Sequence, residues 1–169
     1  MPGSLERILH ALEASGVRYI VVGGVAVVLH GHLRTTADLD LVIDLEPANA
    51  RRAIDALAGL GFRPRAPVAA EDFAQPEVRR AWIEEQGLQV FSLWNPSAQE
   101  FEVDVFASEP FEFDPAWRRA ERVTLGSTEA VVASIDDLIT PKLAAGRPED
   151  LRDIEALEAL RAARRQAPA

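Results

Sequence analysis

Two aspartates one residue apart, preceded by a glycine pair, are the residues of this chain best suited to chemistry. Asp38 and Asp40 lie in a hydrophobic run that follows Gly23 and Gly24. In a strand, alternate side chains share a face, so the two carboxylates point the same way, roughly 6.6 Å apart. Carboxylate oxygens at that spacing can hold one or two Mg²⁺ ions against phosphate oxygens. The pattern indicates a site for a metal and a triphosphate.

The glycine pair supplies a second feature of such a site. The apolar residues 17–22 predict a strand that ends at Gly23 and Gly24 and turns at once into a short helix, about residues 24–31. Glycine leaves backbone N–H groups uncovered, and the start of a helix carries partial positive charge. We therefore expect an anion to bind at this turn.

A third carboxylate, Asp104, lies in an alternating run that predicts a strand over 101–107. Apolar residues occupy one face of that strand, and Asp104 lies on the other with Glu102 and Phe106. Asp104 can therefore face an active site from a strand whose other side is core. The alternative is that it simply faces water.

Other segments complete an alternating pattern of helices and strands. We expect three further helices, over 4–15 with Ser4 as N-cap, over 48–60 and over 71–86. Another helix is expected from Ser134 to Gly146, with a bend or break at Pro141. The last helix is expected to begin at about 148 and to point Leu151, Ile154, Leu157 and Leu160 inward. We expect further strands over 39–43, 88–94 and 123–132, the last as a hairpin, and a loop over 64–70. His30 and His32 are expected to end the short helix, and Asp44 to end its strand.

The bulk composition predicts one soluble domain over residues 1–169, with a core of about 17–132 and C-terminal helices over about 134–162. Apolar residues make up 48% and charged residues 27% of the chain, which is ordinary for a globular protein. The chain has no cysteine and no run of membrane-spanning length, so we expect a cytoplasmic protein with no membrane partner.

The formal net charge of −9 argues against a broad nucleic-acid-binding surface, because neutralising phosphates requires clustered Lys and Arg. A local basic groove is still compatible with this charge. Most of the arginine pairs lie in helical patterns, where a solvated face is the commoner explanation.

A glycine pair, a short helix, Asp-x-Asp and a later Asp together resemble the nucleotidyltransferase superfamily, whose fold is that of DNA polymerase beta. The finer pattern is Gly23-Gly-x-Ala26, His30-Gly31, Arg34-x-Thr36-x-Asp38-x-Asp40 and Lys142-x-x-Ala-Gly-Arg147-x-x-Asp150-x-x-Asp153. It looks most like small bacterial AbiEii-type nucleotidyltransferases, many of them linked to toxin–antitoxin systems. The resemblance implies an α/β (α+β) fold with a mixed sheet flanked by helices and a helical C-terminal segment.

The resemblance also implies roles for individual residues. Asp38, Asp40 and Asp104 would be catalytic ligands of Mg²⁺ or Mn²⁺, and Gly23 and Gly24 would cradle the triphosphate of a nucleotide such as ATP. Arg34 and Lys142 could contact triphosphate oxygens, or could equally be surface ion-pair partners.

The implied activity is transfer of a nucleoside monophosphate from an NTP to a hydroxyl on an RNA end such as that of a tRNA, a protein or a small molecule. The protein would then be a toxin–antitoxin component with a cognate antitoxin as partner. A small antibiotic-like acceptor is a further possibility, and the acidic composition would suit a cationic one. The alternative is a nucleotide- or partner-binding domain without catalysis, because Gly24 replaces a frequent serine and no acceptor-binding helical domain is evident.

Overall fold

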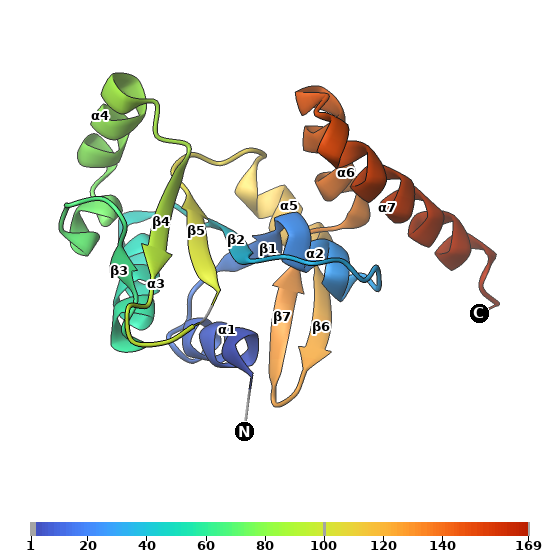
Figure 1. Cartoon of the computed structure of the whole chain (residues 1–169), viewed down its shortest axis with the longest axis horizontal. Helices are drawn as coiled ribbons and strands as arrows, with labels where there is room; N and C mark the ends of the chain where they lie inside the picture. Colours follow the sequence, from blue (N-terminus) through green and yellow to red (C-terminus); the bar gives the residue numbers. More distant parts are fainter. Residues whose placement is uncertain (1–2, 100, 169) are drawn as a thin grey trace.

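The computed structural model describes residues 3–99 and 101–168, which form a mixed seven-stranded sheet flanked by helices (Figure 1). The strands are β1 (Tyr19–Val22), β2 (Asp38–Ile43), β3 (Arg63–Pro64), β4 (Val90–Trp94), β5 (Glu102–Phe106), β6 (Glu121–Leu125) and β7 (Thr128–Val132). The helices are α1 (Ser4–Ala14), α2 (Gly23–Leu29), α3 (Pro47–Gly59), the 3₁₀ helix η1 (Ala70–Ala74), α4 (Pro76–Gln86), α5 (Phe113–Arg119), α6 (Ile135–Ala145) and α7 (Pro148–Gln166). The expected mixed sheet, flanking helices and helical C-terminus are confirmed.

The strand order is β3-β4-β5-β2-β1-β7-β6. β1 and β2 are antiparallel and joined through α2, whereas β2 pairs in parallel with β5, and β1 in parallel with β7. The end of β1, the start of β2 and the start of β5 therefore meet at one edge of the sheet. This edge is where the glycine pair and the first aspartate lie.

Along the start of β2, successive side chains point alternately into the core and toward the candidate site. Leu39 and Leu41 are fully buried, whereas Asp38 is exposed and Asp40 is half-buried. The core beneath them is completed by α1, which buries Ile8 and packs against β7 and α3. The strand is thus fixed by its leucines, and its aspartates face away from them.

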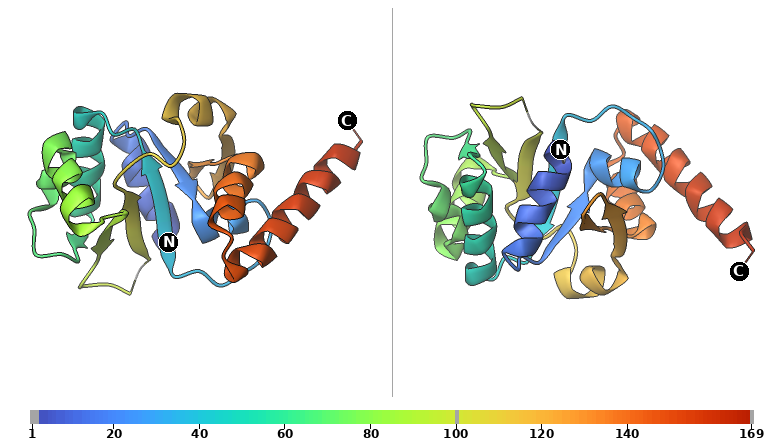
Figure 2. Two further views of the ribbon diagram at one scale, coloured as in Figure 1. Left: turned by 90° about the horizontal axis from the view of Figure 1, so that it is seen from above. Right: turned by 90° about the horizontal axis from the view of Figure 1, so that it is seen from below.

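The C-terminal helices form the far end of the molecule. α6 packs against α7, and α7 extends beyond the sheet to the C-terminal end (Figure 2). Ile154 and Leu157 are buried and Leu160 is half-buried as expected, but Leu151 is 57% exposed. The positions that α7 buries near its start are instead Asp150 and Asp153.

Two expectations about helix boundaries are wrong. Gly3, and not Ser4, is the N-cap of α1. The helix expected over 71–86 is two helices, because Pro76 forces the preceding Gln75 out of helical geometry. Of the two outcomes expected at Pro141, the break does not occur, because α6 runs through it from Ile135 to Ala145 with Ile135, Leu138 and Ile139 buried.

The structure also contains elements that the sequence pattern did not predict. α5 lies between β5 and β6, and the short strand β3 pairs with β4 where only a loop was expected. Within the described residues, no helix is both long enough and apolar enough to cross a membrane.

Asn49 on α3 joins the beginning of β1 to the end of β2, and it is only 2% exposed. Its Nδ2 donates to the backbone oxygens of Arg18 (3.1 Å) and Asp44 (2.8 Å), and its Oδ1 accepts from the Arg18 N–H (2.9 Å). We expect Asn49→Ala to lower the free energy of unfolding by about 2 to 4 kcal/mol, because buried backbone groups lose their partners. Chemical denaturation measures this change.

The matched control is Arg51→Ala on the same helix, which removes only an exposed ion pair with Asp55. Its expected effect is below about 0.5 kcal/mol. Equal effects of the two substitutions would contradict the role assigned to Asn49.

Candidate active site

The three aspartates singled out by the sequence lie together on adjacent strands. Asp40 on β2 stands directly opposite Asp104 on β5, and Asp38 stands opposite Glu102. Ser92 on β4 is the cross-strand partner of Asp104 and donates its hydroxyl to Asp104 Oδ1 (2.5 Å). The prediction that Asp104 faces the same site as Asp38 and Asp40 is therefore consistent with the register of the sheet.

Two of these carboxylates, Asp40 and Asp104, have raised pKa values. Burial raises the pKa of Asp40 to about 6, and the charges of Asp104 and Asp38 add to this effect, while Lys142 and Arg34 act against it. Burial also raises the pKa of Asp104, although the hydrogen bond from Ser92 opposes the shift. A site of this kind concentrates negative charge and would be stabilised by a bound cation.

Gly23 makes the position of Asp40 possible. Its φ is +66°, and a Cβ at this position would lie 2.1 Å from Asp40 Oδ2. Any larger residue would be strained and would also displace the carboxylate. The absence of a side chain at Gly23 therefore leaves the space that the Asp40 carboxylate occupies, and its positive φ also forms the turn before α2.

Gly24 is enclosed by a different pair of side chains. A Cβ there would lie 2.8 Å from the Thr36 hydroxyl and 3.4 Å from Arg34 Cζ. The Thr36 hydroxyl thus occupies the space into which a serine at position 24 would project. The sequence pattern contains Thr36, but nothing in its spacing showed that the residue folds back over Gly24.

Arg34 and Lys142 both belong to an ion-pair network built on two buried aspartates, although the Arg34 side chain itself is 36% exposed. Arg34 pairs with Asp153, and the Lys142 Nζ lies 3.0 Å from Asp150 Oδ1 and 3.1 Å from Asp153 Oδ2. The two aspartates are only 3% and 5% exposed. Arg34 and Lys142 are therefore ion-paired, and both also lower the pKa of Asp40. The two cations form one wall of the site, and the aspartates of α7 hold them in place.

Arg147 completes this network through its contact with Asp150 (2.8 Å). Burial alone would raise the pKa of Asp150, but the hydrogen bonds from Lys142 and Arg147 outweigh it and leave the pKa below the usual value. The i, i+3 spacing of Asp150 and Asp153 on α7 was the available signal for this network, because it places both on one helix face.

Two further residues have the structural roles that the sequence suggested. His30 is the C-cap of α2, and its buried Nε2 lies 2.8 Å from the backbone oxygen of Ala133. Asp44 follows the end of β2 and pairs with Arg18 (2.5 Å). Neither residue belongs to the cluster of Asp38, Asp40 and Asp104.

The carboxylates supply the hard oxygen donors that Mg²⁺ prefers, and their elevated pKa values indicate charge that a cation would offset. Among residues 3–99 and 101–168, however, no three Asp, Glu, His or Cys side chains already stand in the arrangement of a complete metal site. Metal ligation by Asp38, Asp40 and Asp104 therefore stays a prediction.

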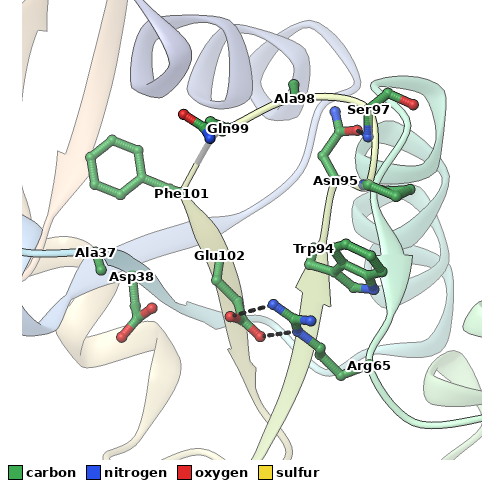
Figure 3. A pocket seen from close by; sticks show the side chains of 11 residues that line it. Ala37, Asp38, Arg65, Trp94, Asn95, Ser97, Ala98, Gln99, Phe101 and Glu102 are labelled. Carbon is green, nitrogen blue, oxygen red and sulfur yellow. Dashed lines mark hydrogen bonds and ion pairs between the residues drawn. The ribbon is translucent and has the colours of Figure 1, made fainter.

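A pocket of about 510 Å³ opens beside Asp38, at the ends of β4 and β5 (Figure 3). Arg65 lies over the Trp94 ring, 4.5 Å from its centroid, and forms a two-point contact with Glu102 (2.8 and 3.2 Å). Phe101 and the polar loop after Trp94 complete the described lining. The pocket is large enough for a small ring compound next to the carboxylates.

The family described as "Nucleotidyltransferase of unknown function (DUF6036)" matches residues 5–162. The chain belongs to this nucleotidyltransferase family. The resemblance to the superfamily is thus confirmed, and the protein is an enzyme of the nucleotidyltransferase class, whereas a particular closeness to AbiEii-type proteins stays a prediction. No curated protein matches the sequence.

Solved nucleotidyltransferases share the fold. The lincosamide antibiotic adenylyltransferase LnuA, bound to lincomycin, is 17% identical with a TM-score of 0.60, and the match covers 93% of this chain and 96% of LnuA. ANT(2″)-Ia in complex with adenylyl-2″-tobramycin is 17% identical with a TM-score of 0.58 (95% and 94% covered). A putative nucleotidyltransferase, TM1012 from Thermotoga maritima, is 13% identical with a TM-score of 0.56 (89% and 88% covered).

The raised pKa of Asp40 predicts a dependence of stability on pH. Between the ordinary value of 3.8 and about 6, the folded nucleotidyltransferase binds more protons than the unfolded chain, so this group makes stability fall as pH rises through that range. We expect Asp40→Asn to raise the free energy of unfolding of the metal-free protein at neutral pH by about 1 to 3 kcal/mol. Near pH 3.5 the two proteins should differ little.

Denaturant titrations across this pH range, in the presence of a chelator, measure the difference. Asp55→Asn is the control, because that carboxylate is exposed on α3 and pairs with Arg51 away from the site. An Asp40→Asn protein that is less stable than wild type at neutral pH would contradict the repulsion argued here.

Proposed function

We propose that this nucleotidyltransferase moves a nucleoside monophosphate from an NTP to a hydroxyl acceptor in a Mg²⁺-dependent reaction. The observation that carries the proposal is the opposed pair Asp40 and Asp104, with Asp38 beside them and two cations close by. Carboxylates that repel each other in a half-buried position are costly unless a ligand uses them. A nucleotide with its metal would use both the acidic and the basic side of the site.

Each residue has a definite task in this proposal. Asp38, Asp40 and Asp104 would hold Mg²⁺, which when bound would acidify the acceptor hydroxyl and neutralise the leaving pyrophosphate. The Ser92 hydroxyl keeps Asp104 in a fixed orientation.

Phosphate binding falls to the other wall of the site. Arg34 and Lys142 would offset the negative charge of the phosphates. Gly23 and Gly24 would let the phosphates approach the backbone, and Thr36 would offer the hydroxyl that Gly24 lacks.

The pocket beside Asp38 is the proposed place of the acceptor, because in-line transfer needs the acceptor and the pyrophosphate on opposite sides of the reacting phosphorus. Of the described lining residues, only Arg65 is cationic, and Glu102 already pairs with it. Phosphates of an RNA end would be repelled there. A small neutral or cationic molecule suits the pocket better, and the ANT(2″)-Ia and LnuA structures hold adenylyl-2″-tobramycin and lincomycin, respectively.

The test is nucleotide transfer from α-phosphate-labelled NTPs with Mg²⁺ and a bacterial extract, followed by separation of RNA, protein and small-molecule fractions. We expect wild type to label the small-molecule fraction and Asp38→Ala/Asp40→Ala to retain less than about 1% of that activity, since metal stabilisation of the transition state amounts to several kcal/mol. Asp55→Ala should retain wild-type activity, because this exposed carboxylate lies on α3.

Retained transfer in the double variant would overturn the proposed mechanism. NTP binding without any labelled product would favour the alternative, a nucleotide-binding domain without catalysis. Thermal unfolding with and without NTP and Mg²⁺ reports binding independently of transfer.

A cytoplasmic location stays a prediction from the composition. A toxin role, with an antitoxin protein as partner, is the finer part of the proposal and rests on the resemblance. Expression in a bacterial host tests it. Growth arrest that depends on Asp38 and Asp40 would support the role, and normal growth would count against it.

A further inference from the structure

A second pocket, smaller and more apolar, is lined by Gly23 and by residues of β5 and α6. It has a volume of about 140 Å³ and is formed by the end of β5, the loop that follows, and α6. Its apolar lining comprises Val22, Phe106, Pro110, Phe111, Leu138 and Pro141. The polar residues at its rim include Lys142 and Arg147.

This pocket adjoins the proposed phosphate site directly. Gly23 and Lys142 line the pocket and also belong to the two walls of the site. Phe106 lies two residues beyond Asp104 on the same face of β5. A ligand whose phosphates lie over Gly23 and against Lys142 would therefore reach the pocket with its other end.

The charged groups at the rim are already paired. Arg147 contacts Asp150, and Asp137 receives both the Arg119 guanidinium and the Ser134 hydroxyl. The charges of Arg147 and Asp137 are thus matched within the protein, whereas Lys142, which also pairs with Asp150 and Asp153, in addition lowers the pKa of Asp40 on the side of the proposed phosphate site. What the pocket offers a ligand is apolar contact, chiefly from two half-buried phenylalanine rings.

We propose that this pocket binds the base of the nucleoside triphosphate, by contact with Phe106, Phe111 and Pro141. An NTP is charged at one end and carries a flat aromatic group at the other, and this matches a cationic wall that continues into an aromatic slot. The inference rests on the proposed function and assigns the nucleotide's base to the α6 side. The acceptor keeps the separate pocket beside Asp38.

The rings act through stacking and through exclusion of water, so their contribution should depend on the base and not on the phosphates. Alanine substitution of an aromatic side chain that stacks on a base weakens binding about tenfold or more. A ligand that lacks the base should bind wild type and variant equally. A loss of affinity only for the ligand that carries a base therefore distinguishes a defect in the base pocket from a defect in the phosphate site.

The experiment is calorimetric titration of the full chain in Mg²⁺ with two probes, ATP and ribose 5′-triphosphate. We expect wild type to bind ATP about tenfold more tightly than ribose 5′-triphosphate. Phe111→Ala should weaken ATP binding about tenfold and leave binding of ribose 5′-triphosphate unchanged. The control is Trp117→Ala, which removes a half-buried aromatic side chain on α5 outside the pocket and should leave both affinities unchanged.

Unchanged ATP affinity in a folded Phe111→Ala protein would overturn the base pocket while leaving the proposed function intact. If Phe111→Ala fails to fold, the wild-type comparison decides, because equal affinities for the two probes would also overturn it. If wild type binds neither probe, the proposed function is wrong and this inference falls with it.

Discussion

The repulsion between Asp40 and Asp104 is the constraint on which the rest of this structure depends. Two carboxylates stand opposite each other on neighbouring parallel strands, partly removed from water; burial raises the pKa of both, and the charge of Asp104 raises the pKa of Asp40 further. The fold tolerates them because Leu39 and Leu41, which flank Asp40, fix β2 in the core, and because the cations Arg34 and Lys142 lower the pKa of Asp40. The same unfavourable charge is what a metal-bound nucleotide would convert into binding energy.

The cations that face the aspartates are not free side chains. Arg34 comes from the loop before β2, and Lys142 comes from α6, yet both are held by Asp153 on α7. The C-terminal helix therefore holds both cations in position, although it does not belong to the sheet. This explains why two acidic residues occupy buried positions at the start of α7 where a leucine was expected to point inward.

The sequence was sufficient to predict the central sheet and the carboxylate group, because strand alternation and the glycine pair follow from local geometry. β2 and β5 were predicted within one residue at each end, and their register then brought Asp40 to Asp104. What could not be predicted depends on contacts between distant segments. The return of Thr36 over Gly24, the hydrogen bond from Ser92 and the sharing of Asp153 arise only when loops and helices pack together. At Gln75 the helix stops as the local effect of the following Pro76 requires, whereas at Pro141 the helix continues although a proline there favours a stop.

The position of Thr36 has an evolutionary consequence. Its hydroxyl fills the space in which a serine at position 24 would lie, so a side chain at position 24 would require the Thr36 side chain to move. Relatives with serine at the position of Gly24 should carry a residue smaller than threonine, or a displaced loop, at the position of Thr36. A hydroxyl group can then persist at one point in space while moving between two segments of the chain, and an alignment that scores each column alone would record this as a loss.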